Sequence, residues 1–151
     1  PRALARLGDV FRARSEDAVV ARHLGAAWDL THGDAAVGRR YGRVLLDLSR
    51  DAEALQVLER TADVLQDDAV VWMNLGVARY RDGDLPGSEE AYDWAARIDP
   101  TSPDPFEGLA LVRARRGDRD GASEAMHVYL VNGGPHPERG RAFIEEMGER
   151  R

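Results

Sequence analysis

Large apolar and small residues recur along this chain at a spacing of 34 residues. Within each block, positions 4, 7, 8 and 11 fall on one helical stripe, and positions 20, 24 and 27 fall on a second. A large residue is followed by a small one at Leu7-Gly8, Tyr41-Gly42, Leu75-Gly76 and Leu109-Ala110. The small residue lets a second helix lie close to the first. The pattern therefore predicts antiparallel helix pairs in residues 1–34, 35–68, 69–102 and 103–136.

The residues between the two stripes predict where the helices end. We expect the first helix of each pair to end at Ser15-Glu16, Ser49-Arg50, Gly83-Asp84 and Gly117-Asp118. Glycine takes the left-handed conformation that closes many helices, and Asp caps the helix that follows. Pro86 suits the first turn of its helix, where a missing N–H costs little.

Two features depart from the regular pattern. Gly38 stands where a large apolar residue is expected, so we predict a thin spot there or a gap filled by a neighbour. The array is expected to stop in residues 131–135, and residues 137–149 then predict one more short helix. Its apolar residues Ala142, Phe143 and Met147 would cover the edge of the last pair, with a polar outer face.

The best-formed block lies in residues 72–100. Its characteristic residues are Trp72, Leu75-Gly76, Gly83-Asp84, Tyr92, Ala95 and Pro100. With the four in-phase blocks, this pattern resembles the tetratricopeptide repeat (TPR) family. The resemblance implies an all-α fold, a right-handed TPR superhelix (α-solenoid) of antiparallel helix pairs. It divides the chain into four repeats (1–34, 35–68, 69–102 and 103–136) and a C-terminal capping helix and tail (137–151).

The resemblance also implies a concave groove, lined by the first helix of each repeat, that binds a peptide or an extended protein segment. The groove positions selected here are Arg6, Arg39, Arg40, Arg43, Val70, Met73, Asn74, Val77, Tyr80, Arg81 and Leu111. The arginines of the first two repeats would hold acidic groups, and the apolar residues of the last two would take hydrophobic anchors. The predicted partner is therefore another protein or peptide with acidic groups beside apolar ones. The simpler alternative is that the polar residues only solvate a surface.

Chaperone-binding TPR proteins hold the carboxylates of a C-terminal Glu-Glu-Val-Asp-type tail in a basic clamp. Arg39 and Asn74 match two positions of that clamp, but Arg43 stands in place of an Asn. Asp104 and Gly108 stand where two basic residues belong. The clamp is incomplete, so binding of such a tail is not predicted.

No residue pattern points to catalysis, a cofactor or a metal. The chain has no cysteine, and its histidines lack ligand partners at helical spacing. The carboxylate pairs Glu89-Glu90 and Glu145-Glu146 are expected on solvated helix faces. We therefore predict a protein that is not an enzyme, with no cofactor and no metal site.

Charge and hydropathy narrow the class of partner. The net charge of −6 disfavours nucleic acid. No apolar run approaches the roughly 20 residues of a membrane span, so direct membrane insertion is not expected. The cytoplasm is the favoured compartment, and the periplasm is the alternative if a leader was trimmed before Pro1.

Two other functions stay open at the level of sequence. One is a homo-oligomeric structural scaffold that assembles through its terminal repeats. Self-association through the first repeat would cover an apolar edge that no preceding helix covers. The other is the regulatory TPR arm of a larger enzyme.

Overall fold

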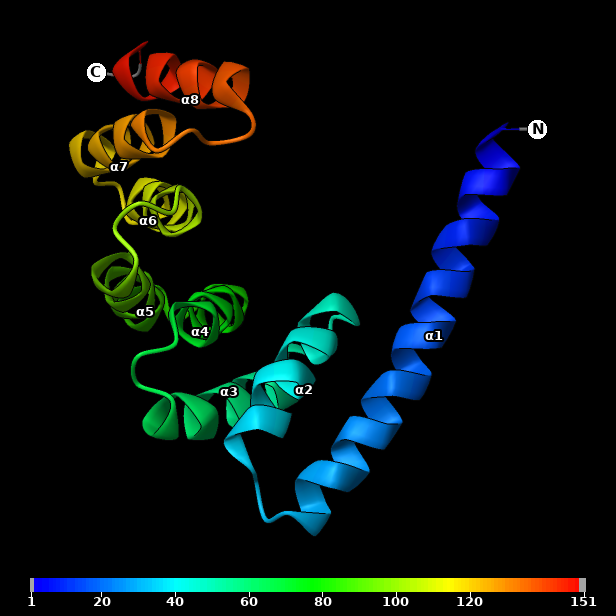
Figure 1. Ribbon diagram of the computed structural model, residues 1–151. Coiled ribbons are helices and arrows are strands. Elements are labelled where there is room, and N and C mark those ends of the chain that lie inside the picture. Colours follow the sequence, from blue (N-terminus) through cyan, green and yellow to red (C-terminus); the bar gives the residue numbers. More distant parts are fainter. Residues whose placement is uncertain (1, 150–151) are drawn as a thin grey trace. The chain divides into compact units, whose positions relative to one another are not determined.

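Helices joined by short turns make up the computed structural model, which describes the backbone of residues 2–149 and the side chains of residues 10 and 12–149 (Figure 1). Within this range the elements are α1 (Arg2–Leu30), α2 (Ala35–Asp47), α3 (Asp51–Val64), α4 (Ala69–Asp82), α5 (Leu85–Ile98), α6 (Asp104–Arg115), α7 (Arg119–Val131) and α8 (Pro137–Glu149). The chain divides into two compact units, Pro1–Leu65 and Gln66–Arg151, named unit 1 and unit 2 below. Unit 1 contains α1–α3, and unit 2 contains α4–α8.

The first repeat does not form a helix pair. α1 is one continuous helix of 29 residues, drawn as an unbroken ribbon in Figure 1. The predicted helix end at Ser15-Glu16 is therefore wrong. No glycine or proline lies between Gly8 and Gly25, so no residue there favours the left-handed turn, and Ser and Glu cost little inside an exposed helix.

Gly38 of α2 makes room for a side chain from α1. A Cβ at Gly38 would collide with Thr61 Oγ1 and with the ring of Trp28. The Trp28 ring, from the C-terminal part of α1, thus occupies the space that a large residue at position 38 would fill. The prediction of a gap filled by a neighbour is confirmed. A similar approach occurs at Gly42, where an added Cβ would lie 2.5 Å from Leu58 Cδ2 of α3.

The turns between the helices of each pair share one backbone conformation. Gly83 and Gly117 have φ values of 91° and 87°, as the sequence predicts for left-handed helix ends. Ser49 occupies the same repeat position and also adopts a positive φ, 59°. Its N–H donates to the carbonyl oxygen of Leu46 at 3.0 Å. The turn is therefore set by the helix packing even where the residue is not glycine.

Aspartate side chains cap four of the helices. The residues are Asp34 for α2, Asp68 for α4, Asp84 for α5 and Asp118 for α7, and each carboxylate accepts from backbone N–H groups of the first turn. The predicted caps at Asp84 and Asp118 are confirmed. α3 has Arg50 at the corresponding position and no side-chain cap bond.

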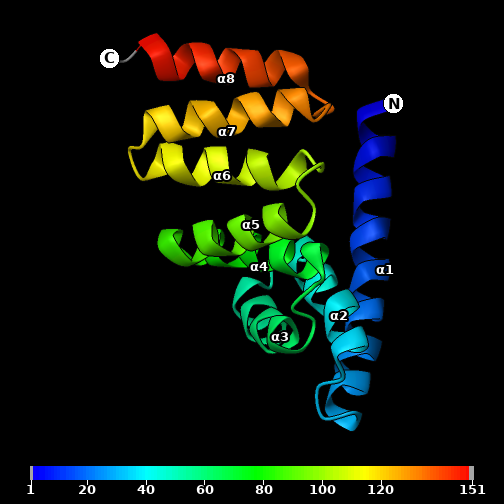
Figure 2. The ribbon, with the colours of Figure 1, turned by 60° about the vertical axis from the view of Figure 1, so that its left-hand side comes forward.

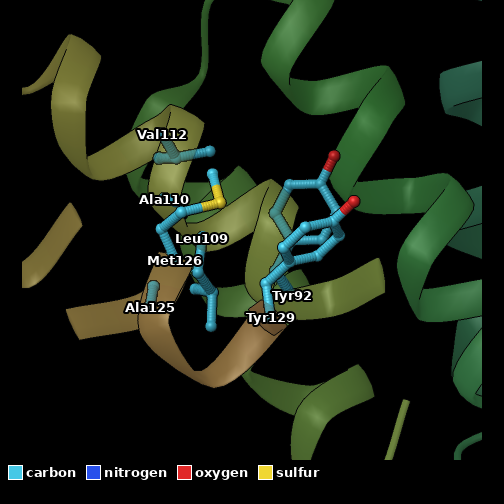
Figure 3. Close-up of a cluster of buried hydrophobic side chains, with 7 residues drawn as sticks. All are labelled: Tyr92, Leu109, Ala110, Val112, Ala125, Met126 and Tyr129. Carbon is cyan, nitrogen blue, oxygen red and sulfur yellow. The ribbon is translucent and has the colours of Figure 1, made fainter. Parts of the chain in front are cut away.

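In unit 2 the helices pack in sequence order, first α4 with α5, then α6 with α7, and finally α8 on α7 (Figure 2). The residues at the centre are Tyr92, Leu109, Ala110, Val112, Ala125, Met126 and Tyr129 (Figure 3). Phe143 and Ile144 of α8 pack against this cluster. The predicted helix of residues 137–149 is thus present, and it covers the last helix pair.

Candidate functional site

An apolar stripe runs along one side of α4 and continues on α6. Its members, named the α4–α6 face, are Val70, Met73, Val77 and Tyr80 on α4 and Leu111 on α6. Val70 is 47% exposed and Leu111 is 44% exposed, although both are large apolar residues. The other three are half-buried. Exposed apolar residues that share one face mark a surface suited to a partner.

Buried residues of these helices form part of the core, and Val77 and Tyr80 of the face pack against it, which fixes the face in place. Tyr92 of α5 lies between α4 and α6, because glycines on both helices leave room for its ring. A Cβ at Gly76 would lie 2.8 Å from Tyr92 Cε1, and a Cβ at Gly108 would lie 2.5 Å from the same atom. Gly108 is therefore a packing residue beneath the surface.

The Tyr92 phenol is buried, and burial raises its pKa to about 12 from the ordinary 10.0. The nearby Tyr80 and Glu107 raise this pKa further, and Arg81 lowers it. Tyr80 and Arg81 belong to α4 and Glu107 to α6, so the Tyr92 phenol is influenced by groups of both helices.

Arg115 and Tyr80 link the two helices of the face. The guanidinium carbon of Arg115 lies 5.0 Å from the centroid of the Tyr80 ring, within the range of a cation–π contact. The contact holds the Tyr80 ring against α6. One side of the ring is thus covered by a cation, and Tyr80 as a whole stays half-buried.

The polar groove positions of α4 differ in exposure. Arg81 is exposed. Asn74 is only 4% exposed, and its Nδ2 has no hydrogen-bond partner among the described residues. Buried amide groups are usually paired, so Asn74 contributes an unpaired donor beneath the surface.

Four of the arginines selected from the sequence belong to unit 1, whereas Arg81 and the apolar face belong to unit 2. Arg39, Arg40 and Arg43 all lie on α2 and are exposed. Arg43 Nε is 3.2 Å from both carboxylate oxygens of Asp47, so part of its charge is already balanced. Arg6 belongs to α1, but its side chain lies outside the described set.

Unit 2 also contains a pocket between α6, α7 and α8, named the cap pocket below. Its volume is about 330 Å³, and it is lined by Glu107, Leu111, Met126, Tyr129, Arg139, Gly140, Ala142, Phe143 and Glu146. The sequence predicted that α8 covers the edge of the last helix pair, but it did not predict that α8 forms one wall of a pocket. The signal that could have indicated it is Gly140, a small residue in the middle of the capping helix.

Charged residues and tryptophans gather on another side of unit 2. Glu89 of α5 is 17% exposed and accepts from Arg113 Nε at 2.9 Å and from Arg116 Nη1. The Trp94 ring stacks on the Trp72 ring with centroids 5.8 Å apart. Arg97 lies over the Trp94 ring at 5.4 Å. The charged groups are paired within the protein and the tryptophan rings stack on each other, which indicates a structural role.

Among the described side chains, those of residues 10 and 12–149, no three His, Cys, Asp or Glu come together in a way that could hold a metal ion. Over the same described range, every helix is too short or too polar to cross a membrane.

No family model matches this sequence, and no curated protein matches it. The fold is similar to a crystal structure of MamA, with 19% sequence identity, a TM-score of 0.84, and coverage of 94% of this chain and 82% of that one.

It is also similar to the Yersinia enterocolitica type III secretion chaperone SycD in complex with a peptide of the translocator YopD. That match has 15% identity and a TM-score of 0.69, and it covers 75% of this chain and 91% of SycD. The first TPR of Spaghetti (RPAP3) bound to the HSP90 peptide SRMEEVD matches with 14% identity and a TM-score of 0.72, covering 77% of this chain and 91% of that one. The chain therefore has an all-α solenoid fold of the TPR type, as the sequence predicts.

Proposed function

We propose that this chain is a non-catalytic protein-binding module that holds an extended segment of another protein on the α4–α6 face. The observation that carries the proposal is a pair of exposed apolar side chains, Val70 and Leu111, together with the half-buried apolar residues of the same face, two of which are held by the core. Because the core holds these residues in place, little conformational entropy is lost when a partner binds them. The fold is compatible with this role, because SycD and the Spaghetti TPR were each solved with a peptide.

The apolar residues would supply most of the affinity. Each apolar side chain covered by a partner contributes about 25 cal/mol per Å² of buried surface. Tyr80 and Met73 suit the centre of such a surface, because Tyr is frequent among dominant contact residues and Met adapts to different partners. Arg81 is exposed and belongs to the same proposed site on α4, whereas Asn74 is buried beneath it.

In unit 1, the arginines of α2 form a separate basic surface for acidic groups of the partner protein. Arg39, Arg40 and Arg43 are exposed and close in sequence, so they can pair with carboxylates of a partner. The Arg43–Asp47 pair is itself exposed. Exposed pairs of this kind contribute about 0–1 kcal/mol, so exchange for a carboxylate of the partner costs little. Arg6 remains a proposed member of this basic group from the sequence.

An HSP90-type tail is not the proposed ligand. The tail's basic clamp would need basic residues at positions 104 and 108, where this chain has Asp104 and Gly108. Gly108 lies beneath the face against the Tyr92 ring, so a long basic side chain there would clash with the core. The proposed partner is therefore an internal or extended segment with apolar anchors.

The proposal is tested by capturing partners from the native organism with the purified chain and quantifying them by mass spectrometry. Val70→Glu places a charge on the face at an exposed position and is expected to remove the specific partner. Val131→Glu is the matched control, because Val131 is 85% exposed and lies outside the face. Equal recovery of every partner by both variants would refute the proposed site.

Self-association is the second candidate, and α1 favours it. Val10, Val19 and Val20 of this helix are exposed apolar residues. A second copy would cover them in a homo-oligomeric scaffold. Light scattering over a range of concentrations tests this function, since a monomer at every concentration would exclude it.

A further inference from the structure

The cap pocket has a buried floor and apolar sides, and the charged residues Glu107, Arg139 and Glu146 also line it. Met126 and Tyr129 of α7 form the floor and are both buried. Leu111 of α6 and Phe143 of α8 line the sides, the first exposed and the second half-buried. Figure 3 shows Met126 and Tyr129 within the packed cluster, which holds the floor in position. An apolar side chain that enters would therefore meet a preformed surface.

Gly140 brings α8 close enough to act as a wall. A Cβ at Gly140 would lie 2.8 Å from Leu130 Cδ2 and 3.4 Å from Met126 Sδ. A larger residue at this position would have to displace the Leu130 side chain or move α8 away from α7. The volume of about 330 Å³ is at the lower end of the range of about 300–1,000 Å³ typical of ligand pockets.

Glu107 brings a carboxylate to this pocket. It is half-buried in the first turn of α6. Among the described side chains, those of residues 10 and 12–149, none forms an ion pair or hydrogen bond with this carboxylate. A half-buried carboxylate beside an apolar hollow gains most from a cation that arrives with an apolar group.

We propose that the cap pocket takes an aliphatic side chain of an extended peptide, and that Glu107 holds a Lys or Arg next to it. The inference rests on the proposed function, because Leu111 belongs both to the α4–α6 face and to the cap pocket. One bound segment can therefore run from the face into the pocket. The segment then has a basic residue beside the anchor at α8.

The test begins with a phage library of random dodecapeptides selected on the full chain. The enriched peptides are synthesised with a fluorophore and titrated by anisotropy against the chain and its variants. Ala142→Arg blocks the pocket from an exposed position on α8. Glu107→Gln removes the charge and keeps the shape. The matched controls are Ala52→Arg, at an exposed alanine of α3, and Asp104→Asn, in the same helical turn as Glu107 but outside the pocket.

The expected enriched peptides carry Leu, Ile or Met beside Lys or Arg. Ala142→Arg is expected to weaken their binding by about tenfold or more, since one buried aliphatic side chain accounts for that factor. Glu107→Gln is expected to weaken it by about two- to fivefold, the range of a partly exposed charge pair. Both controls are expected to bind as the unmodified chain does. Circular dichroism verifies that each variant is folded.

The outcomes separate this inference from the proposed function. Peptides weakened by Val70→Glu but not by Ala142→Arg would overturn the cap-pocket assignment and leave the α4–α6 face as the binding site. Peptides whose affinity is unchanged by both substitutions, or a library without any enriched peptide, would overturn the cap-pocket assignment and the proposed function. Acidic residues beside the anchor, with tighter binding to Glu107→Gln, would overturn the assignment of a basic neighbour.

Discussion

The ring of Tyr92 occupies the space that Gly76 leaves on α4. A Cβ added at Gly76 would lie 2.8–2.9 Å from three atoms of this ring. The ring is rigid and buried between two helices, so it cannot move aside as a flexible side chain would. The contact is therefore the one that sets how closely α4 and α5 pack.

A large residue at position 76 should destabilise the protein. Gly76→Leu is expected to lower the free energy of unfolding by about 1–3 kcal/mol, because overpacking forces the Tyr92 ring or the helices apart. Urea denaturation measures this. Gly148→Leu is the control, since no atom outside its own helix lies within 4 Å of a Cβ there. Equal effects of the two substitutions would show that the helix contact is elsewhere.

A glycine at position 49 should stabilise the protein. Ser49 has a φ of 59°, and a residue with a side chain pays about 1–2 kcal/mol for the left-handed conformation. Ser49→Gly removes this cost but loosens the unfolded chain, so the expected net gain is about 0.5–1 kcal/mol by thermal or urea unfolding.

The same substitution at Ser15 provides the control. Ser15 holds the equivalent repeat position but lies inside α1. Ser15→Gly is expected to cost about 0.5 kcal/mol, because glycine is the poorer helix former. A gain at both sites, or a loss at both, would contradict the assignment of backbone strain to Ser49.

Alkaline pH should weaken the fold through Tyr92. Its folded pKa of about 12 lies above the ordinary 10.0, so the folded chain keeps this proton after the unfolded chain has lost it. The stabilising contribution is complete below pH 10 and is lost as the pH rises towards 12. Urea unfolding at a series of pH values should therefore show a steeper loss between pH 10 and 12 for the unmodified chain than for Tyr92→Phe. Parallel curves would contradict the buried position of the phenol.

The basic residues of α2 should make partner binding sensitive to salt. Replacing Arg39 and Arg43 with Glu is expected to weaken binding of the captured partner by about tenfold and to flatten its dependence on salt, because screening acts on charge pairs. Arg22→Glu with Arg141→Glu makes the same change in net charge on α1 and α8. Titrations at several ionic strengths compare the two variants, and an unchanged affinity of the α2 variant would place the acidic contact elsewhere.

The repeat period was sufficient to predict most of the helices. Close approach of two helices requires a small residue at Gly76, a positive φ favours glycine at Gly83, and a helix cap favours Asp84. Such local requirements can be recognised in the sequence. The first repeat was mispredicted because Ser15-Glu16 is compatible with a helix end and equally with a helix interior. The 34-residue repeat indicates where a helix can end, and the helix propensity of the residues at that point decides whether it does.

The sequence by itself determined the helical repeat, the glycine and aspartate positions of the turns, and the apolar stripe from Val70 to Leu111. Only the tertiary structure decided which groove positions are surface. Asn74 and Gly108 are buried, and the pocket beside Leu111 is completed by α8. The reason is physical: helical spacing assigns a residue to a face of its own helix, but exposure depends on the side chains of other helices that cover that face.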